Sequence, residues 1–325
     1  MVKVVQITQP GGPEVLQIAN VTLGDPGPGE VRVRHHAVGL NFVDVYNRNG
    51  MYKQPAYPCG IGSEAAGVVE KVGPKVKGLK AGDRVAYGSG PLGAYSEARI
   101  MPAASVVKLP KEISYETAAA MMLKGMTVEY LLNRTYKVKK GQTVLMHAAA
   151  GGVGLIFCQW ARKLGVNVIG TVGSDEKAKL AKANGCKYTI NYATEDFVAR
   201  VKEITKGKGV PVVYDSVGKD TFERSLDCLS PTGMLVSFGS ASGPVPPFNV
   251  ASLAQKGSLY VTRPTLFTHA SNRATLESMA NNLFRMVKSK AVKIRIEQTY
   301  PLAQAAQAQI DLVARKTTGS TVLIP

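Results

Sequence analysis

The sequence predicts an α/β protein built of two domains, a β-rich domain of barrel type and a domain with a doubly wound parallel sheet. Three observations predict this fold class. The chain has 325 residues, of which 45% are hydrophobic and 19% charged, which suits soluble globular domains and is enough for two of them. Short alternating apolar runs dominate the first 124 residues. From Thr143 onward, strand-like and helix-like runs follow one another in turn.

The first region is predicted to form a small barrel or sandwich. Its alternating runs, separated by clusters of Gly and Pro, are residues 31–34, 66–72 and 83–87. Alternation with period two, interrupted by turn residues at this spacing, is typical of such folds. Residues 114–130 differ, because Ser114 suits a helix N-cap and the Ala, Met and Leu that follow favour a helix. We expect this helix to connect the two domains.

The second region is predicted to alternate strands with helices, the pattern of a parallel sheet covered on both faces. The expected strands are residues 143–148, 167–172, 188–190, 211–215, 234–238 and 258–262. The expected helices are residues 155–164, 175–184, 194–205 and 221–229. Thr194 is predicted as the N-cap of the third of these helices, and Gly185 as the residue that closes the second.

The C-terminal tail is predicted to return to the first domain. It contains a helix over residues 274–288, a strand over 293–300, a helix after Pro301 and a last strand over 321–324. We therefore expect a discontinuous first domain, residues 1–124 with 264–325, and a second domain of residues 125–263.

The run TVLMHAAAGGVG, residues 143–154, predicts a dinucleotide site. Strand, glycine turn and helix follow in the order that such a fingerprint requires. Gly151 has no Cβ to block a pyrophosphate, the helix start offers N–H groups, and Gly154 permits close packing of helix on strand. Ala149 stands where the first glycine of the pattern is usual, so the turn alone also fits an ordinary core helix. The glycine turn follows the first strand of the predicted sheet, and this position favours a dinucleotide site over an ordinary core helix.

The end of the second strand of this sheet favours NADPH over NADH. Folds specific for NAD place an acidic side chain there to bind the ribose hydroxyls. Here Gly173 and Ser174 leave room for a 2′-phosphate, Lys177 supplies a positive charge, and Tyr192 can donate a hydrogen bond. Asp175 is the competing acid, but a carboxylate at a helix N-terminus has an ordinary role in compensating the helix dipole.

Composition predicts no membrane span, no disulfide framework and no metal site. No apolar run approaches the roughly 18 to 20 residues of a membrane helix. The N-terminal stretch lacks the pattern of a signal peptide, so a cytoplasmic location is expected. Four widely spaced cysteines form no C-x-x-C pair, and the four histidines lack metal-ligand spacing.

The formal charge of +17 suits a polyanionic partner, which includes nucleic acid and a phosphorylated cofactor or substrate. Lysines gather at residues 71–80 and 137–140, without the interleaved aromatic residues of single-strand binders. A solvated basic face is the favoured interpretation, and nucleic-acid binding is the alternative from another functional class.

The chain resembles the medium-chain dehydrogenases/reductases, and within them the quinone oxidoreductases of zeta-crystallin type. The resemblance covers essentially the whole chain, through GGPEVLQ (11–17), VGLNFVDVY (38–46), GSEAAGVVEKVG (62–73), AGDRVAY (81–87), LGAYSE (92–97), HAAAGGVG (147–154) and YDSVG (214–218). It implies a GroES-like β-barrel catalytic domain and a Rossmann domain that binds NADPH.

The chain departs from the zinc-dependent members of this superfamily. Their pattern has cysteine where Asn41 stands and histidine where Ser63 precedes Glu64, and their run of four structural cysteines is absent. Without a Lewis acid to stabilise an alkoxide, alcohol oxidation is disfavoured. The resemblance therefore implies hydride transfer from NADPH to a quinone, whose ring delocalises the arriving charge. An α,β-unsaturated carbonyl (a 2-alkenal or enone) is the rival acceptor.

The resemblance also implies the site residues. Asn41, Tyr46, Tyr52 and Thr127 would line the nicotinamide and substrate cleft, and either tyrosine could donate a hydrogen bond or a proton. Packing is the alternative role for both tyrosines. The pyrophosphate and the 2′-phosphate would meet residues of the loops: Gly151, Gly152, Val153, Gly173, Ser174, Lys177 and Tyr192. Further cofactor contacts are expected beyond the later strands: Ser216, Phe238, Gly239, Ser240 and Arg263. The last strand, residues 258–262, would pair with its copy in a homodimer.

Overall fold

The chain folds into two units, which the computed structural model describes over all residues 1–325. Unit 1 comprises Met1–Met126, His269–Ser289 and Ile294–Pro325, and unit 2 comprises Thr127–Thr268 and Lys290–Lys293. The chain passes from one unit to the other within helix α2 (Tyr115–Tyr130). As predicted, Ser114 caps this helix, with its hydroxyl oxygen accepting from the Thr117 N–H at 3.1 Å.

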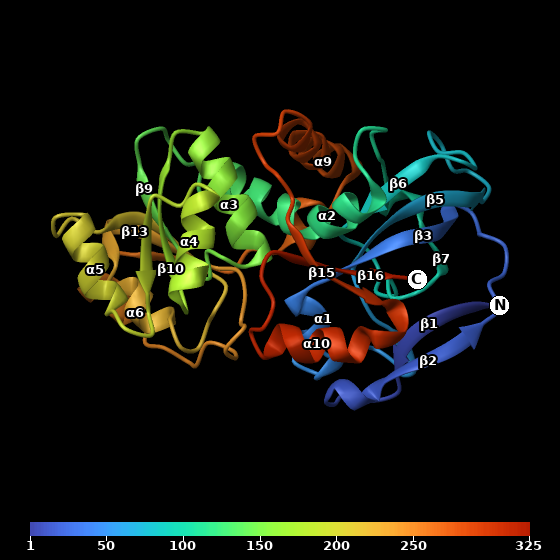
Figure 1. The fold of residues 1–325 in the computed structure, drawn as a ribbon, viewed down its shortest axis with the longest axis horizontal. Helices are drawn as coiled ribbons and strands as arrows, with labels where there is room; N and C mark the ends of the chain where they lie inside the picture. The colour runs from blue at the N-terminus through green and yellow to red at the C-terminus, as the bar shows by residue number, and fades with distance from the viewer. The chain divides into compact units, whose positions relative to one another are not determined.

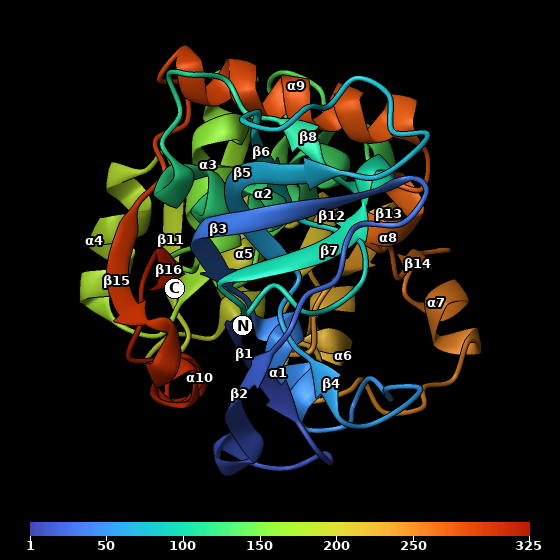
Figure 2. The ribbon, with the colours of Figure 1, turned by 90° about the vertical axis from the view of Figure 1, so that its right-hand side faces the viewer.

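Unit 1 is built on antiparallel strands, as its alternating sequence predicts. A seven-stranded sheet has the order β15-β16-β3-β5-β6-β8, with β7 also paired to β3. Its strands are β3 (Glu30–Leu40), β5 (Glu64–Val72), β6 (Arg84–Tyr87), β7 (Ala98–Pro102), β8 (Val107–Lys108), β15 (Ile296–Pro301) and β16 (Ser320–Ile324). A smaller sheet contains β1 (Val2–Ile7), β2 (Leu16–Val21) and β4 (Cys59–Gly60). Figure 2 shows the long strand β3 between β5 and β7.

Most of the C-terminal tail belongs to unit 1, while residues 264–268 and Lys290–Lys293 belong to unit 2. Strand β16 runs antiparallel to β3, with Thr321 opposite Leu40, and parallel to β15. The helices of this unit, besides most of α2, are α1 (Phe42–Arg48), α9 (Arg273–Lys288) and α10 (Ala305–Val313). Val322 and Leu323 are fully buried, so the last strand completes the sheet on which the polar cluster described below is built.

Unit 2 is a doubly wound parallel sheet, which confirms the prediction. Its strand order is β11-β10-β9-β12-β13-β14, and every pairing is parallel. The strands are β9 (Thr143–Met146), β10 (Asn167–Val172), β11 (Tyr188–Asn191), β12 (Val210–Asp215), β13 (Leu229–Ser237) and β14 (Tyr260–Thr262). In Figure 1, α3 (Gly152–Lys163) and α4 (Asp175–Ala183) lie on one face of this sheet, and α5 (Phe197–Ile204) and α6 (Phe222–Leu226) on the other. Two short helices, α7 (Ala251–Gln255) and α8 (Leu266–His269), flank β14 in sequence.

Several predicted boundaries in unit 2 are wrong for physical reasons. The first strand ends at Met146, two residues early, because Ala148 turns into the left-handed region with φ of 54°. The N-cap of α5 is Asp196, not Thr194, since its carboxylate accepts from the N–H groups of Val198 and Ala199 at 2.8 and 3.0 Å. Helix α6 ends at Leu226, and Leu229 already belongs to β13.

None of the helices combines the length and the apolar composition that a membrane crossing needs. All four cysteines are free thiols. Gly185 closes α4 with φ of 101°, as predicted from its place after the helix.

Candidate active site and cofactor loops

The glycine turn of unit 2 leaves the first turn of helix α3 open to a ligand. Gly151 is the N-cap of α3 in extended conformation, and no side chain caps the helix there. The N–H groups of a helix's first turn lack partners within the helix, and those of Gly152 and Val153 belong to it. A Cβ on Gly154 would lie 2.4 Å from the carbonyl oxygen of Ala148, so only glycine permits this close packing. These residues fit a bound pyrophosphate.

The four residues predicted for the 2′-phosphate come together at the ends of β10 and β11. Val172 is paired with Asn191, so the residues that follow them meet at one edge of the sheet. A Cβ on Gly173 would lie 2.7 Å from the Tyr192 hydroxyl oxygen. Ser174 caps α4, with its hydroxyl oxygen accepting from the Lys177 N–H at 3.3 Å. The loop therefore brings the Tyr192 hydroxyl, the Ser174 cap and the N-terminal turn of α4, which contains Lys177, to the same strand ends.

The predicted residues beyond the later strands also gather at one edge of the sheet. They are Ser216, Phe238, Gly239, Ser240 and Arg263. A Cβ on Gly239 would lie 2.6 Å from the Ser216 carbonyl oxygen. The Arg263 guanidinium donates to the carbonyl oxygens of Ser237 and Gly239 at 3.1 and 2.8 Å. Arg263 thus holds the chain that follows β13 in place. This structural role was not predicted; the sequence analysis expected only a contact with the cofactor.

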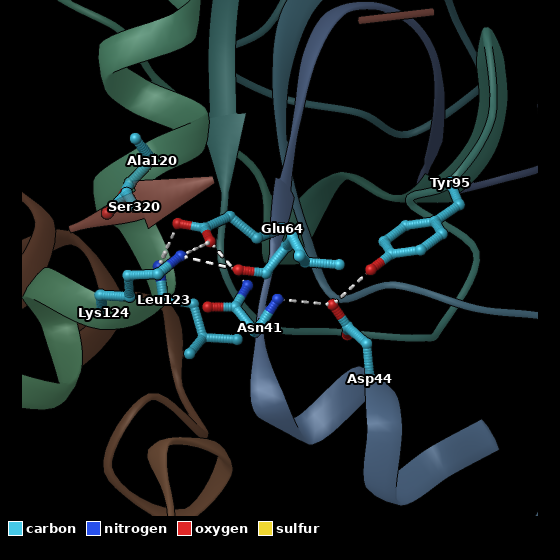
Figure 3. Close-up of polar contacts among 9 residues, drawn as sticks. Asn41, Asp44, Glu64, Tyr95, Ala120, Leu123, Lys124 and Ser320 are labelled. Carbon is cyan, nitrogen blue, oxygen red and sulfur yellow. Dashed lines mark hydrogen bonds and ion pairs between the residues drawn. The ribbon is translucent and has the colours of Figure 1, made fainter. Parts of the chain in front are cut away.

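Asn41 stands at the centre of a buried polar cluster in unit 1 (Figure 3). It follows β3 directly, and Glu64 begins β5 opposite Gly39. The Asn41 amide nitrogen donates to the Glu64 carboxylate at 2.7 Å, and Asn41 is only 5% exposed. Because the amide nitrogen is directed to Glu64, the amide oxygen is the acceptor end of this side chain, and it takes part in the capping box at the start of α1.

Lys124 brings a positive charge to the same carboxylate (Figure 3). Its ammonium nitrogen lies 3.4 Å from a Glu64 oxygen and donates to the Leu40 carbonyl oxygen at 3.0 Å. The Leu123 N–H donates to the other Glu64 oxygen at 2.7 Å. Burial raises the pKa of Glu64, while Lys124 and the hydrogen bonds oppose this rise. Glu64 is fully buried, so the cluster is a desolvated ion pair with an amide attached to it.

Asp44 extends the cluster on the far side of Asn41 (Figure 3). One carboxylate oxygen accepts from the Asn41 backbone N–H and from the Tyr95 hydroxyl, each at 2.9 Å. The other oxygen is buried without a hydrogen-bond partner. Burial raises the pKa of Asp44 to about 7, against the lowering effect of these hydrogen bonds. Asp44 is the third residue of α1, a helix that the sequence analysis did not predict.

The residues of this cluster do not form a zinc ligand set. Asn41 and Ser63 occupy the two positions where the zinc pattern has cysteine and histidine, and the Asn41 amide nitrogen faces Glu64. No group of three or more His, Cys, Asp or Glu side chains in the chain is placed to hold a metal ion. The Lys124 ammonium beside Glu64 would repel a divalent cation.

The two predicted tyrosines lie together in unit 1. Tyr46 is buried within α1, and Tyr52 follows that helix with 39% of its surface exposed. Their rings meet edge to face with centroids 5.5 Å apart, and the Tyr52 N–H donates to the Tyr46 carbonyl oxygen at 3.0 Å. Thr127, the fourth predicted cleft residue, is buried on α2 and belongs to unit 2.

Sequence reasoning did not identify Glu64, Lys124 or Asp44 as residues of the site. The sequence contained a signal for two of them, Lys124 and Asp44. Lys124 is the one charged residue in the apolar run of residues 118–126, where a lysine needs a buried partner. Asp44 stands three residues after Asn41, which is the spacing of a capping box, and the Asp44 carboxylate accepts from the Asn41 N–H as that motif requires.

Comparison with known proteins matches two segments of the chain to domains of the dehydrogenases. Residues 27–111 match the alcohol dehydrogenase GroES-like domain, and residues 152–281 match the zinc-binding dehydrogenase family. The chain is 55% identical to a quinone oxidoreductase of Pseudomonas aeruginosa, over the full length of both. It is 47% identical to a 2-haloacrylate reductase of a Burkholderia species, covering all of this chain and 99% of that protein.

A solved structure extends this likeness to the fold. The structure of Escherichia coli quinone oxidoreductase in complex with NADPH superposes with a TM-score of 0.98 at 51% identity. The match covers 99% of this chain and 100% of that one. The expected GroES-like and Rossmann folds are thereby confirmed.

Proposed function

The chain belongs to the medium-chain dehydrogenase/reductase superfamily, among its quinone oxidoreductases, and on this basis we propose that it reduces quinones with NADPH and without a metal. The proposal that the reaction needs no metal is supported by the buried cluster of Asn41, Glu64 and Lys124 in unit 1. Where the zinc pattern has its ligands, the Asn41 amide is hydrogen-bonded to Glu64 beside the Lys124 ammonium.

NADPH, when bound, supplies the hydride. The N–H groups at the start of α3 hold its pyrophosphate, because a helix N-terminus with no side-chain cap favours an anion. Ser174, Lys177 and Tyr192 take the 2′-phosphate, and Gly173, which has no Cβ, lets the Tyr192 hydroxyl approach the end of β10. In this proposal residues 125–263 form the cofactor domain, and residues 1–124 with 264–325 form the catalytic domain.

Asn41 acts as a hydrogen-bond acceptor of fixed orientation. Glu64 accepts from its amide nitrogen, and the Lys124 ammonium beside it opposes the rise in the pKa of Glu64 that burial causes. The amide oxygen would then be the acceptor that this side chain offers to a hydrogen-bond donor of bound NADPH or of the substrate. A fixed acceptor contributes to rate by holding the reacting groups in one geometry, with no reorganisation during the reaction.

Tyr46 and Tyr52 are the candidates for contact with the acceptor. A quinone that gains one hydride and one proton becomes a hydroquinone, so the reduced oxygen needs a hydrogen-bond or proton donor. A phenol hydroxyl is suited to this role, and two of them lie edge to face in unit 1. Thr127, buried on α2, remains a predicted contact of the cofactor.

A homodimer is part of the proposal. Strand β14 is the edge of the six-stranded sheet, and Tyr260 on it is 59% exposed. Unpaired edge strands offer a row of backbone groups that a second copy can bind. A cytoplasmic location also stays part of the expectation.

The acceptor class has a second candidate. The similarity to a 2-haloacrylate reductase favours an activated alkene, in which hydride adds to a carbon conjugated to a carbonyl group. The separating experiment is a comparison of kcat/KM for NADPH oxidation with ortho- and para-quinones and with a 2-alkenal. Higher values for quinones support the proposal, whereas turnover of the alkenal alone would overturn it in favour of the second candidate.

A further inference from the structure

Acidic side chains surround the proposed 2′-phosphate site. Asp175 and Glu176 open helix α4 beside Ser174, and Glu195 and Asp196 lie in the loop that follows Tyr192. A carboxylate near this position attracts the ribose hydroxyls of NADH and repels a 2′-phosphate. A loop that selects NADPH must therefore hold these acids in other contacts.

Two of the acids in the second loop have cationic partners. Glu195 is paired with Arg200 at 2.9 Å, and Asp196 with Arg224 at 2.6 Å. The Asp196 carboxylate also caps α5. The negative charges of Glu195 and Asp196 are each compensated by a neighbouring arginine, so neither carboxylate is available to the cofactor.

Asp175 is held in a different way, by an uncharged amide. The Asn191 side-chain nitrogen donates to one Asp175 oxygen at 2.9 Å. Asn191 is the last residue of β11, opposite Val172 of β10, so it reaches Asp175 across the two strand ends. The contact joins the segment after β10 to the segment after β11, the two that supply the phosphate site.

The orientation of the Asn191 amide is fixed by a second hydrogen bond. Its side-chain oxygen accepts from the Ala193 N–H at 3.2 Å, which leaves the nitrogen as the end that faces Asp175. The Asn191 backbone N–H donates to Glu195 at 2.8 Å. Hydrogen bonds therefore hold both the side chain and the backbone of Asn191, and they fix the position of the amide nitrogen that donates to Asp175.

We infer that Asn191 is a specificity-determining residue, which holds the Asp175 carboxylate at the end of β11 and so keeps the loop selective for the 2′-phosphate. The inference rests on the proposed use of NADPH. Without the Asn191 donor, Asp175 has no partner of its own and can turn to the ribose, where it accepts hydrogen bonds from NADH and repels NADPH. Asn191 acts through Asp175 and needs no contact with the cofactor.

The test is the ratio of affinities for 2′,5′-ADP and 5′-AMP, which differ only in the 2′-phosphate, measured by calorimetry. The variant is Asn191→Ser, since serine keeps an oxygen for the Ala193 N–H but is too short to reach Asp175. We expect the preference for 2′,5′-ADP to fall about tenfold. The ratio of kcat/KM for NADPH over NADH should fall in parallel.

The double variant Asn191→Ser with Asp175→Asn identifies the cause. Removing the freed charge should return the preference to within about twofold of wild type, as expected for a coupled pair. Glu176→Gln is the matched control, because it removes a neighbouring carboxylate that Asn191 does not hold, and it should not rescue Asn191→Ser.

Three results would overturn the inference: an unchanged preference in Asn191→Ser, a loss that persists in the double variant, or equal affinity of the wild type for both nucleotides. Binding of the two nucleotides requires no acceptor. A protein that prefers 2′,5′-ADP but reduces no quinone would therefore contradict the proposed function and leave this inference supported.

Discussion

At the scale of single residues, the buried ion pair of Glu64 and Lys124 is what makes Asn41 a defined acceptor. Asn41 and Glu64 are 23 positions apart in sequence, and Lys124 another 60 beyond Glu64. The sequence pointed to Asn41 through its resemblance to a known pattern. It could not indicate how the amide is oriented, because that orientation depends on the distant Glu64 carboxylate.

Removing one partner of the Glu64–Lys124 pair should lower the free energy of unfolding more than removing both. Lys124→Met leaves a buried carboxylate without its cation and should lower the free energy of unfolding by about 3 kcal/mol. In the double variant Glu64→Gln with Lys124→Met, most of that loss should be recovered, as measured by denaturant unfolding. Activity should stay low in the double variant, since a glutamine can donate or accept and no longer fixes the Asn41 amide. Recovery of both stability and kcat would contradict the positioning role.

Asp44 predicts a pH dependence of stability. Burial raises its pKa to about 7 in the folded state, above the value for an unfolded chain. The folded state therefore binds this proton more tightly, and the resulting stability is complete at low pH and lost as pH rises through 7. Asp44→Asn cannot ionise, so its stability relative to wild type should improve by about 2 to 3 kcal/mol between pH 5 and pH 9. Thermal unfolding at both pH values checks this, and parallel curves for the two proteins would contradict it.

At the scale of elements, the strongly patterned segments of unit 2 were predictable and their ends were not. Strand β10 and the start of α4 lie where the apolar run and its polar successor place them. The end of β9 depends on the backbone of Ala148, and the cap of α5 on a choice between two polar residues. Helix α1 was missed because its seven residues are too few for a clear helical period.

The turn between β9 and α3 should be intolerant of any side chain at Gly154. A Cβ there would meet backbone atoms of Ala148 and Ala149 at 2.4 to 2.6 Å, so helix and strand would have to separate. Gly154→Ala should lower the free energy of unfolding by about 1 to 3 kcal/mol and weaken 2′,5′-ADP binding. Gly24→Ala is the control, because a Cβ at Gly24 meets nothing within 4 Å. Equal melting temperatures for the two variants would count against this account of the turn.

At the scale of the whole molecule, sequence patterns predicted the two fold types and the return of the tail to the first domain, and the resemblance implied that the folds are GroES-like and Rossmann. Composition alone left the charge of +17 open between a polyanionic partner and a solvated basic face. Side-chain pairing across distant segments, such as Lys124 with Glu64, is set only when the chain has folded, so pattern analysis could not supply it.

The proposed dimer predicts a difference between the two edges of the same sheet. Tyr260 lies on the edge strand β14 and Tyr188 on the opposite edge strand β11. Tyr260→Lys places a charge on the proposed interface and should shift the mass in light scattering from two chains to one. Tyr188→Lys should leave the dimer intact. Dissociation by Tyr188→Lys alone would place the interface on the other edge, and a monomeric wild type would remove the dimer.

The most direct test of the central claim is the stoichiometry of NADPH oxidation against hydroquinone formation. The protein would first be dialysed against a chelator, and the reaction followed without oxygen so that the hydroquinone is not reoxidised. The account predicts one hydroquinone formed for each NADPH oxidised, with kcat unchanged by the chelator or by added zinc. Loss of turnover in the chelator that zinc restores would contradict it, because the Asn41, Glu64 and Lys124 cluster would then not be sufficient without a metal.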